Sequence, residues 1–127
     1  MFSAVALLLA SSAQKNEVPT VRELHVVSVI PGPSKTRFDI YVNGKRVDEV
    51  KSSRKFDLTS HLRAGSNRID VRYDAWNSKF SLLHPSKFDL YDGPSKESRR
   101  LLSVRAHADN PRGTHRIKVR FEPSTRR

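Results

Sequence analysis

Residues 37–50 read RFDIYVNGKRVDEV, and this stretch predicts a β-hairpin. Phe38, Ile40 and Val42 alternate with more polar neighbours, as expected for a strand that lays one face on a core. Asn43-Gly44 then supplies two residues that tolerate positive φ, which a tight type I′ turn requires. Residues 45–50 form the return strand of the expected hairpin.

The same alternation continues on both sides of this hairpin. Further short strands are expected around Leu24, Val26, Val29 and Ile30; Phe56 and Leu58; Ile69, Val71 and Tyr73; Phe80 and Leu82; Phe88 and Leu90; Leu102, Val104 and Ala106; and Ile117, Val119 and Phe121. Turn-forming residues at 109–113 predict that the last two strands pair as a hairpin. About eight short strands predict an all-β fold, a small antiparallel β-sandwich of jelly-roll or immunoglobulin-like topology.

Composition restricts the classes of function. The chain has 127 residues, which suits one domain, and its 24 Lys and Arg against 13 Asp and Glu give a net charge of +11 that favours polyanionic partners. The absence of cysteine excludes a disulfide scaffold, a zinc ribbon and a cysteine nucleophile. Nucleophile elbows, zinc-protease motifs and phosphate-binding glycine loops are also absent, so we expect no enzyme, no catalytic residues and no cofactor.

The N-terminal segment predicts export. Residues 2–13 read FSAVALLLASSA, and Ser11 and Ala13 suit signal peptidase cleavage before Gln14. The apolar run is too short to cross a bilayer, so we expect no transmembrane segment and a secreted or periplasmic protein. A buried first strand or helix is the alternative. The expected organisation is a signal peptide at 1–13, a linker at 14–22, a β-sandwich domain at 23–123 and a basic tail at 124–127.

Residues 38–73 carry a resemblance to a known family. A strand ending in YVNGK, a basic return strand, then FDLT, Leu62, Gly65, Asn67 and an Ile-x-Val strand resemble galactose-binding-like jelly rolls, notably the non-catalytic sugar-binding domain of family-two glycoside hydrolases. In physical terms, Thr59 or Ser60 is expected to cap one helical turn, and Gly65 to adopt the left-handed conformation that ends it. The resemblance implies a sandwich and a sugar-binding class, but it places no ligand.

Trp76 and Asn77 are candidate ligand-binding residues. They lie between two expected strands among hydrogen-bonding side chains, which is the combination of an apolar plane and polar groups that a sugar platform uses. The alternative is that Trp76 plugs one end of the sandwich, and the small size of the domain favours this burial.

His107, Asp109 and His115 flank the expected final hairpin and offer imidazole and carboxylate ligands. They lack cysteine partners and any evident residues that would orient them. We therefore expect surface histidines and no metal site.

Positive charge is concentrated near the C-terminus. Residues 99–127 hold nine Lys or Arg and two acidic residues, so +7 of the net charge of +11 lies there. Arg116, Lys118 and Arg120 alternate with core-facing positions and are expected to share one exposed face, with Arg105 of the neighbouring strand beside them. Either solvent or an anionic partner must offset the repulsion between them.

These observations predict an exported, non-enzymatic binding or accessory module for an anionic polysaccharide or another cell-envelope polymer. The candidate ligand-binding residues are Arg105, Arg116, Lys118, Arg120, Trp76 and Asn77, with no metal ligands. One alternative is a basic nucleic-acid-binding domain, for which the expected face lacks interleaved aromatic residues. Another is a structural subunit that adds strands to a further envelope protein.

Export has a direct test. Mass spectrometry of secreted or periplasmic material should find Gln14 as the first residue, because cleavage is expected after Ala13. Intact Met1 on protein recovered from the cytosol would contradict the expected location.

Overall fold

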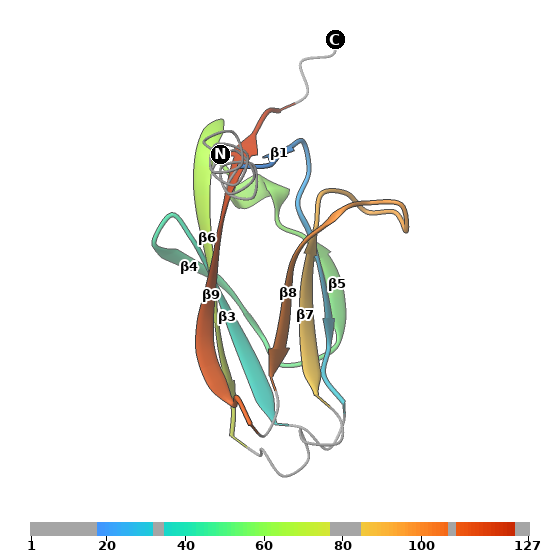
Figure 1. Ribbon diagram of the computed structural model, residues 1–127. Coiled ribbons are helices and arrows are strands. Elements are labelled where there is room, and N and C mark those ends of the chain that lie inside the picture. Colours follow the sequence, from blue (N-terminus) through green and yellow to red (C-terminus); the bar gives the residue numbers. More distant parts are fainter. Residues whose placement is uncertain (1–17, 32–34, 77–84, 107–108, 124–127) are drawn as a thin grey trace, which may run out of the picture.

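The computed structural model describes residues 18–31, 35–76, 85–106 and 109–123, and these ranges form two β-sheets that lie face to face (Figure 1). The five-stranded sheet has the order β1-β9-β6-β3-β4, and the four-stranded sheet has the order β5-β2-β7-β8. All pairings are antiparallel except that of β1 with β9. The predicted all-β sandwich is therefore confirmed, with nine strands in the described residues.

The elements follow one another with short connections. They are β1 (Thr20–Val21), β2 (His25–Val29), β3 (Thr36–Val42), β4 (Lys45–Val50), β5 (Arg54–Asp57), the 3-10 helix η1 (Thr59–His61), β6 (Gly65–Ala75), β7 (Ser86–Tyr91), β8 (Arg100–Ala106) and β9 (Arg112–Phe121). No helix in the described ranges is both long enough and apolar enough to span a membrane.

The core lies between the two sheets and is filled by the alternating apolar residues. Phe38, Ile40 and Val42 of β3 are buried, as their spacing predicts. The ring of Phe38 contacts that of Phe88 on β7, with centroids 5.3 Å apart, and so links the five-stranded sheet to the four-stranded sheet. This cross-sheet burial of apolar area is the main stabilising term of such a fold.

The hairpin predicted from residues 37–50 is present. β3 pairs with β4, and Asn43 and Gly44 have φ angles of 53° and 86° at the turn between them. Glycine and asparagine adopt these angles at low cost, which explains why this turn could be read from the sequence.

The hairpin predicted across residues 109–113 is wrong. β8 pairs with β7, whereas β9 pairs with β6 and with β1, so the connection from β8 to β9 passes from one sheet to the other. The turn residues allow the chain to reverse, but β6 offers β9 a ladder that runs from Gly65–Phe121 to Asp74–Arg112. Alternation tells which face of a strand is buried, and it does not tell which edge the strand joins.

The predicted linker at 14–22 is also corrected. Thr20–Val21 forms β1 beside the end of β9, and the side chain of Val21 belongs to the core. The sandwich thus begins before residue 23. Residues 1–13, Phe80, Leu82 and residues 124–127 lie outside the described ranges.

The turn after β5 is present, but neither Thr59 nor Ser60 caps it. Leu58 is the N-cap residue, and no side chain makes a capping hydrogen bond. Instead, the Thr59 hydroxyl accepts a hydrogen bond from the Leu24 backbone N–H at 2.9 Å, which ties the turn to the segment before β2. Gly65 has the expected positive φ, +90°, at the start of β6.

Gly65→Ala isolates the cost of this backbone conformation. A Cβ atom at position 65 would meet nothing within 4 Å, so any loss reports strain and not a clash. A non-glycine residue with positive φ costs about 1 to 3 kcal/mol, and we expect the free energy of unfolding in urea to fall by this amount. The neighbouring exposed variant Ser66→Ala should change it by far less. Equal stability of Gly65→Ala and the wild type would contradict the assignment.

Candidate functional site

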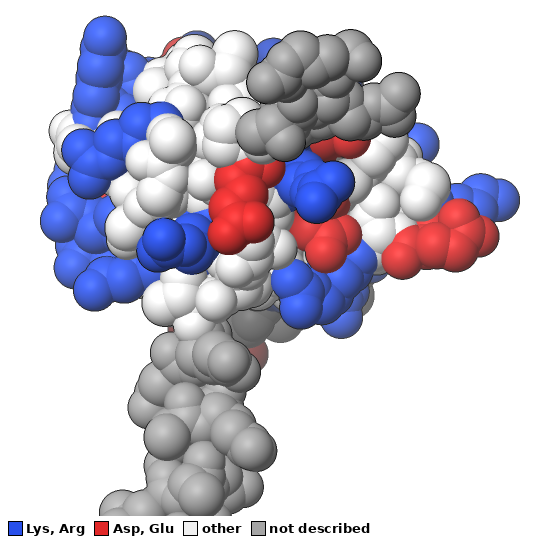
Figure 2. Space-filling model, turned by 90° about the horizontal axis from the view of Figure 1, so that it is seen from above, with Lys and Arg blue, Asp and Glu red and all other residues white. Residues whose placement is uncertain are grey.

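The outer face of the five-stranded sheet carries the basic residues of β9. Arg116, Lys118 and Arg120 are exposed, whereas Val119 between them is buried, so the predicted sharing of one face is confirmed. Figure 2 looks down on the sandwich, and Lys and Arg side chains gather on the left, the side on which Figure 1 draws the five-stranded sheet.

The expectation that Arg105 joins this face is wrong. Arg105 lies on β8 in the four-stranded sheet, where its Nη1 donates a hydrogen bond to Oδ1 of Asp89 at 3.1 Å. Because β8 does not pair with β9, the two strands cannot present their cations on one surface. Arg105 therefore lies apart from the basic residues of β9. The cause is the pairing of β8 with β7 and of β9 with β6, which also rules out the predicted terminal hairpin.

Most cations of the five-stranded sheet have a carboxylate partner. Asp70 is 7% exposed and lies 2.6 Å from Nε of Arg116 and 3.3 Å from Nε of Arg68. At the far end of β9, Arg112 pairs with Asp74 at 3.2 Å. Arg116 therefore neutralises a buried carboxylate, which the sequence did not indicate, and its charge is less available to a ligand than its exposure suggests.

A polar hollow of about 290 Å³ lies where basic side chains are not matched by carboxylates. It is lined by Asn43, Arg63, Ser66, Asn67, Arg68 and Lys118, and no carboxylate is among its lining residues. Arg68 and Lys118 are direct cross-strand partners, so two like charges face each other on the ladder. Among the described residues, neither Arg63 nor Lys118 has an acidic group within 4.0 Å. This hollow is the candidate site, and it is suited to an anion.

The buried side-chain amide of Asn67 connects the segments that line the hollow through hydrogen bonds. Its Oδ1 accepts hydrogen bonds from Nδ2 of Asn43 and from the backbone N–H of Arg63, at 2.9 and 3.0 Å. Its Nδ2 donates to the carbonyl oxygens of Arg63 and Gly65. The Arg63 guanidinium is oriented in turn by the hydrogen bond that its Nε donates to the Ser66 carbonyl oxygen at 3.1 Å. The hollow is thus fixed by hydrogen bonds before any ligand arrives.

Arg63 and Arg68 were not identified from the sequence as site residues. The ladder between β6 and β9 brings Arg68 beside Lys118, although 50 residues separate them in the chain. The available signal was the run of basic residues at alternate positions on two strands. It becomes informative only once the pairing of those strands is known.

Trp76 is 54% exposed, so the interpretation of Trp76 as a buried plug is wrong. It follows the C-terminal end of β6, whereas the hollow lies near the other end, about 30 Å away at roughly 3.3 Å per residue. Trp76 and the hollow therefore do not form one pocket. Asn77 lies outside the described residues.

The three residues considered as metal ligands are only partly described. His107 lies outside the described ranges, Asp109 is exposed, and the imidazole of His115 stacks on Tyr73 with centroids 5.8 Å apart. Burial raises the pKa of the Tyr73 hydroxyl. Within the described part of the chain, His115 thus has a packing role.

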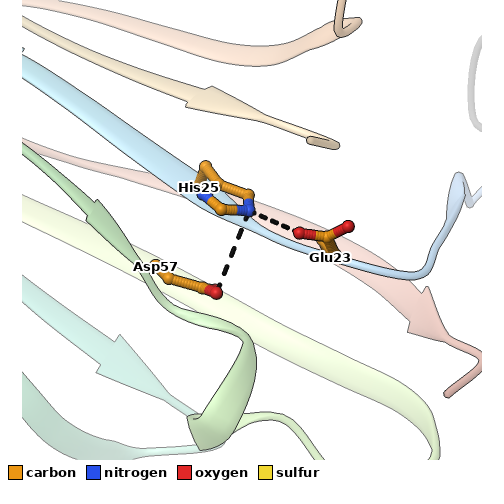
Figure 3. A group of neighbouring side chains, drawn as sticks. All are labelled: Glu23, His25 and Asp57. Atoms are coloured by element: carbon orange, nitrogen blue, oxygen red, sulfur yellow. Dashed lines mark hydrogen bonds and ion pairs between the residues drawn. The ribbon is translucent and has the colours of Figure 1, made fainter. Parts of the chain in front are cut away.

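One other group brings an imidazole and carboxylates together, on the four-stranded sheet. Glu23, His25 and Asp57 have ligand atoms that all lie within 4.8 Å of one another (Figure 3). Hydrogen bonding from the Thr59 side chain lowers the pKa of the Asp57 carboxyl, partial burial opposes this, and the Thr59 backbone N–H and His25 also lower it. Asp57 therefore stays ionised to lower pH than an isolated carboxyl group.

Comparisons with known proteins found no relative of this chain. Neither protein-family models, nor curated proteins, nor solved structures gave a match. The candidate sites stand on their own geometry and chemistry.

Two charge-removing variants of β9 should differ in their effect on stability. Arg116→Gln leaves Asp70 without its 2.6 Å partner, and we expect a loss of about 1 kcal/mol, moderated by the exposure of Arg116. Lys118→Gln removes a charge that directly opposes Arg68, so stability should be unchanged or slightly higher. Urea denaturation of both variants measures the difference. If Lys118→Gln were the more damaging change, the described pairing of charges would be wrong.

Proposed function

We propose that this protein is an exported, non-enzymatic β-sandwich module that binds an anionic glycan or cell-envelope polymer through sulfate or phosphate groups. The observation that carries the proposal is the hollow whose lining includes Arg63, Arg68 and Lys118 and no carboxylate. Guanidinium groups bind planar pairs of anionic oxygens, and an ammonium group adds a compact positive charge.

The size of the hollow supports an anionic group as the unit that is bound. A volume of about 290 Å³ lies at the lower end of the usual range for pockets that enclose a drug-sized molecule. One sulfate or phosphate group would enter the hollow while the polymer continues over the surface. The exposed cations Arg116 and Arg120 on the same strand then supply weaker, longer-range attraction.

The choice of a glycan over a nucleic acid rests on three supports. Residues 38–73 resemble sugar-binding jelly rolls, residues 1–13 have the pattern of an export signal, and Trp76 exposes an aromatic plane of the kind that stacks on sugar rings. The binding test below also compares a nucleic acid with a glycan as the ligand.

Heparin and polyphosphate are suitable probes for this proposal. Both should bind the wild type, and the affinity should fall steeply as salt is raised, because counterions are released on binding. Lys118→Gln and Arg63→Gln should each weaken binding several-fold, and neutral polysaccharide should not bind. Fluorescence anisotropy or calorimetry at two salt concentrations measures these effects.

Arg112→Gln is the matched control for these variants. It removes the same single charge from the same strand as Lys118→Gln, but at the far end of β9 and from an arginine that is already paired with Asp74. It should leave affinity nearly unchanged. An equal loss in Arg112→Gln would indicate attraction to net charge and not a site. Preference for single-stranded DNA over heparin at equal salt would favour the nucleic-acid alternative.

A further inference from the structure

The four-stranded sheet presents a second candidate site on its outer face, away from the basic hollow. His25 is in β2, one of the two inner strands, and its cross-strand partners are Asp57 on β5 and Tyr91 on β7. Glu23 precedes β2 by two residues and reaches the same imidazole. Figure 3 shows the two carboxylates approaching one ring nitrogen of His25 from different elements.

Two carboxylate oxygens lie near Nε2 of His25, and a single proton on this nitrogen can form a hydrogen bond to only one of them. Oε1 of Glu23 lies 2.8 Å from Nε2, which is a hydrogen bond, whereas Oδ2 of Asp57 lies 3.9 Å away, which is not. A proton on Nε2 can point at only one of the two oxygens. A cation placed between the three atoms would contact both carboxylates and the ring nitrogen.

The distances suit a small divalent metal ion. Metal bonds of about 2.0 to 2.2 Å from nitrogen and oxygen ligands, at tetrahedral angles, place neighbouring ligand atoms about 3.4 Å apart. The distances of 2.8 and 3.9 Å lie on either side of that value, and all three ligand atoms lie within 4.8 Å of one another, so side-chain movements of about half an ångström or more would bring them to a metal ion. Imidazole with carboxylate oxygens is a ligand set of zinc sites, whereas calcium takes oxygen ligands in greater number.

One ligand is already held in place by a neighbouring group. The backbone N–H of Thr59 donates a hydrogen bond to Oδ1 of Asp57 at 2.8 Å, so that the other oxygen, Oδ2, is directed at His25. Contacts of this kind orient the ligands of metal sites. The side chain of His25 is 18% exposed, which also limits its freedom of rotation.

Two members of the group lie at the wall of a groove. His25 and Asp57 line a hollow of about 510 Å³ together with Phe56, Tyr91 and the residues that follow β7. The side chains of Glu23 and Asp57 are 51% and 55% exposed, so water or a ligand atom can reach the remaining coordination position. Lys55 and Lys96 also line the groove.

We propose that Nε2 of His25, Oε1 of Glu23 and Oδ2 of Asp57 bind a divalent transition-metal ion of the zinc class, with an open coordination position that faces the groove on the four-stranded sheet. This goes beyond the proposed anion binding, because it concerns the other sheet and a positively charged ligand. From the sequence, with His107, Asp109 and His115 considered as ligands, we expect no metal ligands in the chain, so the proposed site departs from that expectation with a different set of residues.

Calorimetry with zinc chloride on the chelator-treated full chain tests the proposal. The wild type should bind Zn²⁺, and its melting temperature should rise on addition of the metal. His25→Gln and Glu23→Gln should each weaken binding at least tenfold. Because the Glu23 side chain is largely exposed, Glu23→Gln keeps the fold and gives a result even if His25→Gln is unstable.

His115→Gln is the matched control, since it removes an imidazole from β9 on the other sheet. It should retain the affinity for Zn²⁺ and the increase in melting temperature. The proposal is overturned if Zn²⁺ has no effect at millimolar concentration, if His115→Gln loses as much affinity as His25→Gln, or if Ca²⁺ binds more tightly than Zn²⁺. The first outcome would leave a hydrogen-bonded imidazole and carboxylate group without a metal role.

Discussion

The buried amide of Asn67 is the contact on which one end of the sandwich depends. Its oxygen and nitrogen make hydrogen bonds to Asn43 in the β3–β4 turn, to Arg63 between η1 and β6, and to Gly65 at the start of β6. Asn43 and Arg63, which lie in these segments, line the basic hollow. A buried polar group that is fully satisfied specifies a single arrangement, and here that arrangement also fixes where positive charge is left without an acidic partner.

The two sheets carry different groups of charged residues on their outer faces. On the five-stranded sheet, Asp70 and Asp74 pair with Arg116 and Arg112, whereas no carboxylate lines the basic hollow beside Asn67. On the four-stranded sheet, Glu23 and Asp57 converge on His25 beside a groove. The proposed anion site and the proposed cation site are therefore on opposite outer faces of one core. Two ligands of opposite charge could be held without competing for the same surface.

Several parts of the candidate sites could be found from the sequence. Lys118 was identified because alternation along β9 places it on the exposed face, and the exposure of Arg116 and Arg120 follows from the same rule. Arg63 and Arg68 were missed, as was the group formed by Glu23, His25 and Asp57, because their significance depends on neighbours from other strands. The prediction that Trp76 is a buried plug was wrong, since the side chain is 54% exposed. The small size of the domain indicates how much apolar surface must be buried in total, but it does not indicate which side chain is buried.

The sequence by itself determined which residues face the core and where the chain can turn, because both depend on short-range chemistry. The alternation around Phe38 and the positive φ of Asn43-Gly44 are properties of a few adjacent residues. Tertiary structure alone decided that β9 joins β6 and not β8, and so that Arg105 lies far from Lys118 in the sandwich. The physical reason is that a strand with one apolar face can bury that face against the core from either sheet, and only the competition among all possible strand pairings selects its neighbours.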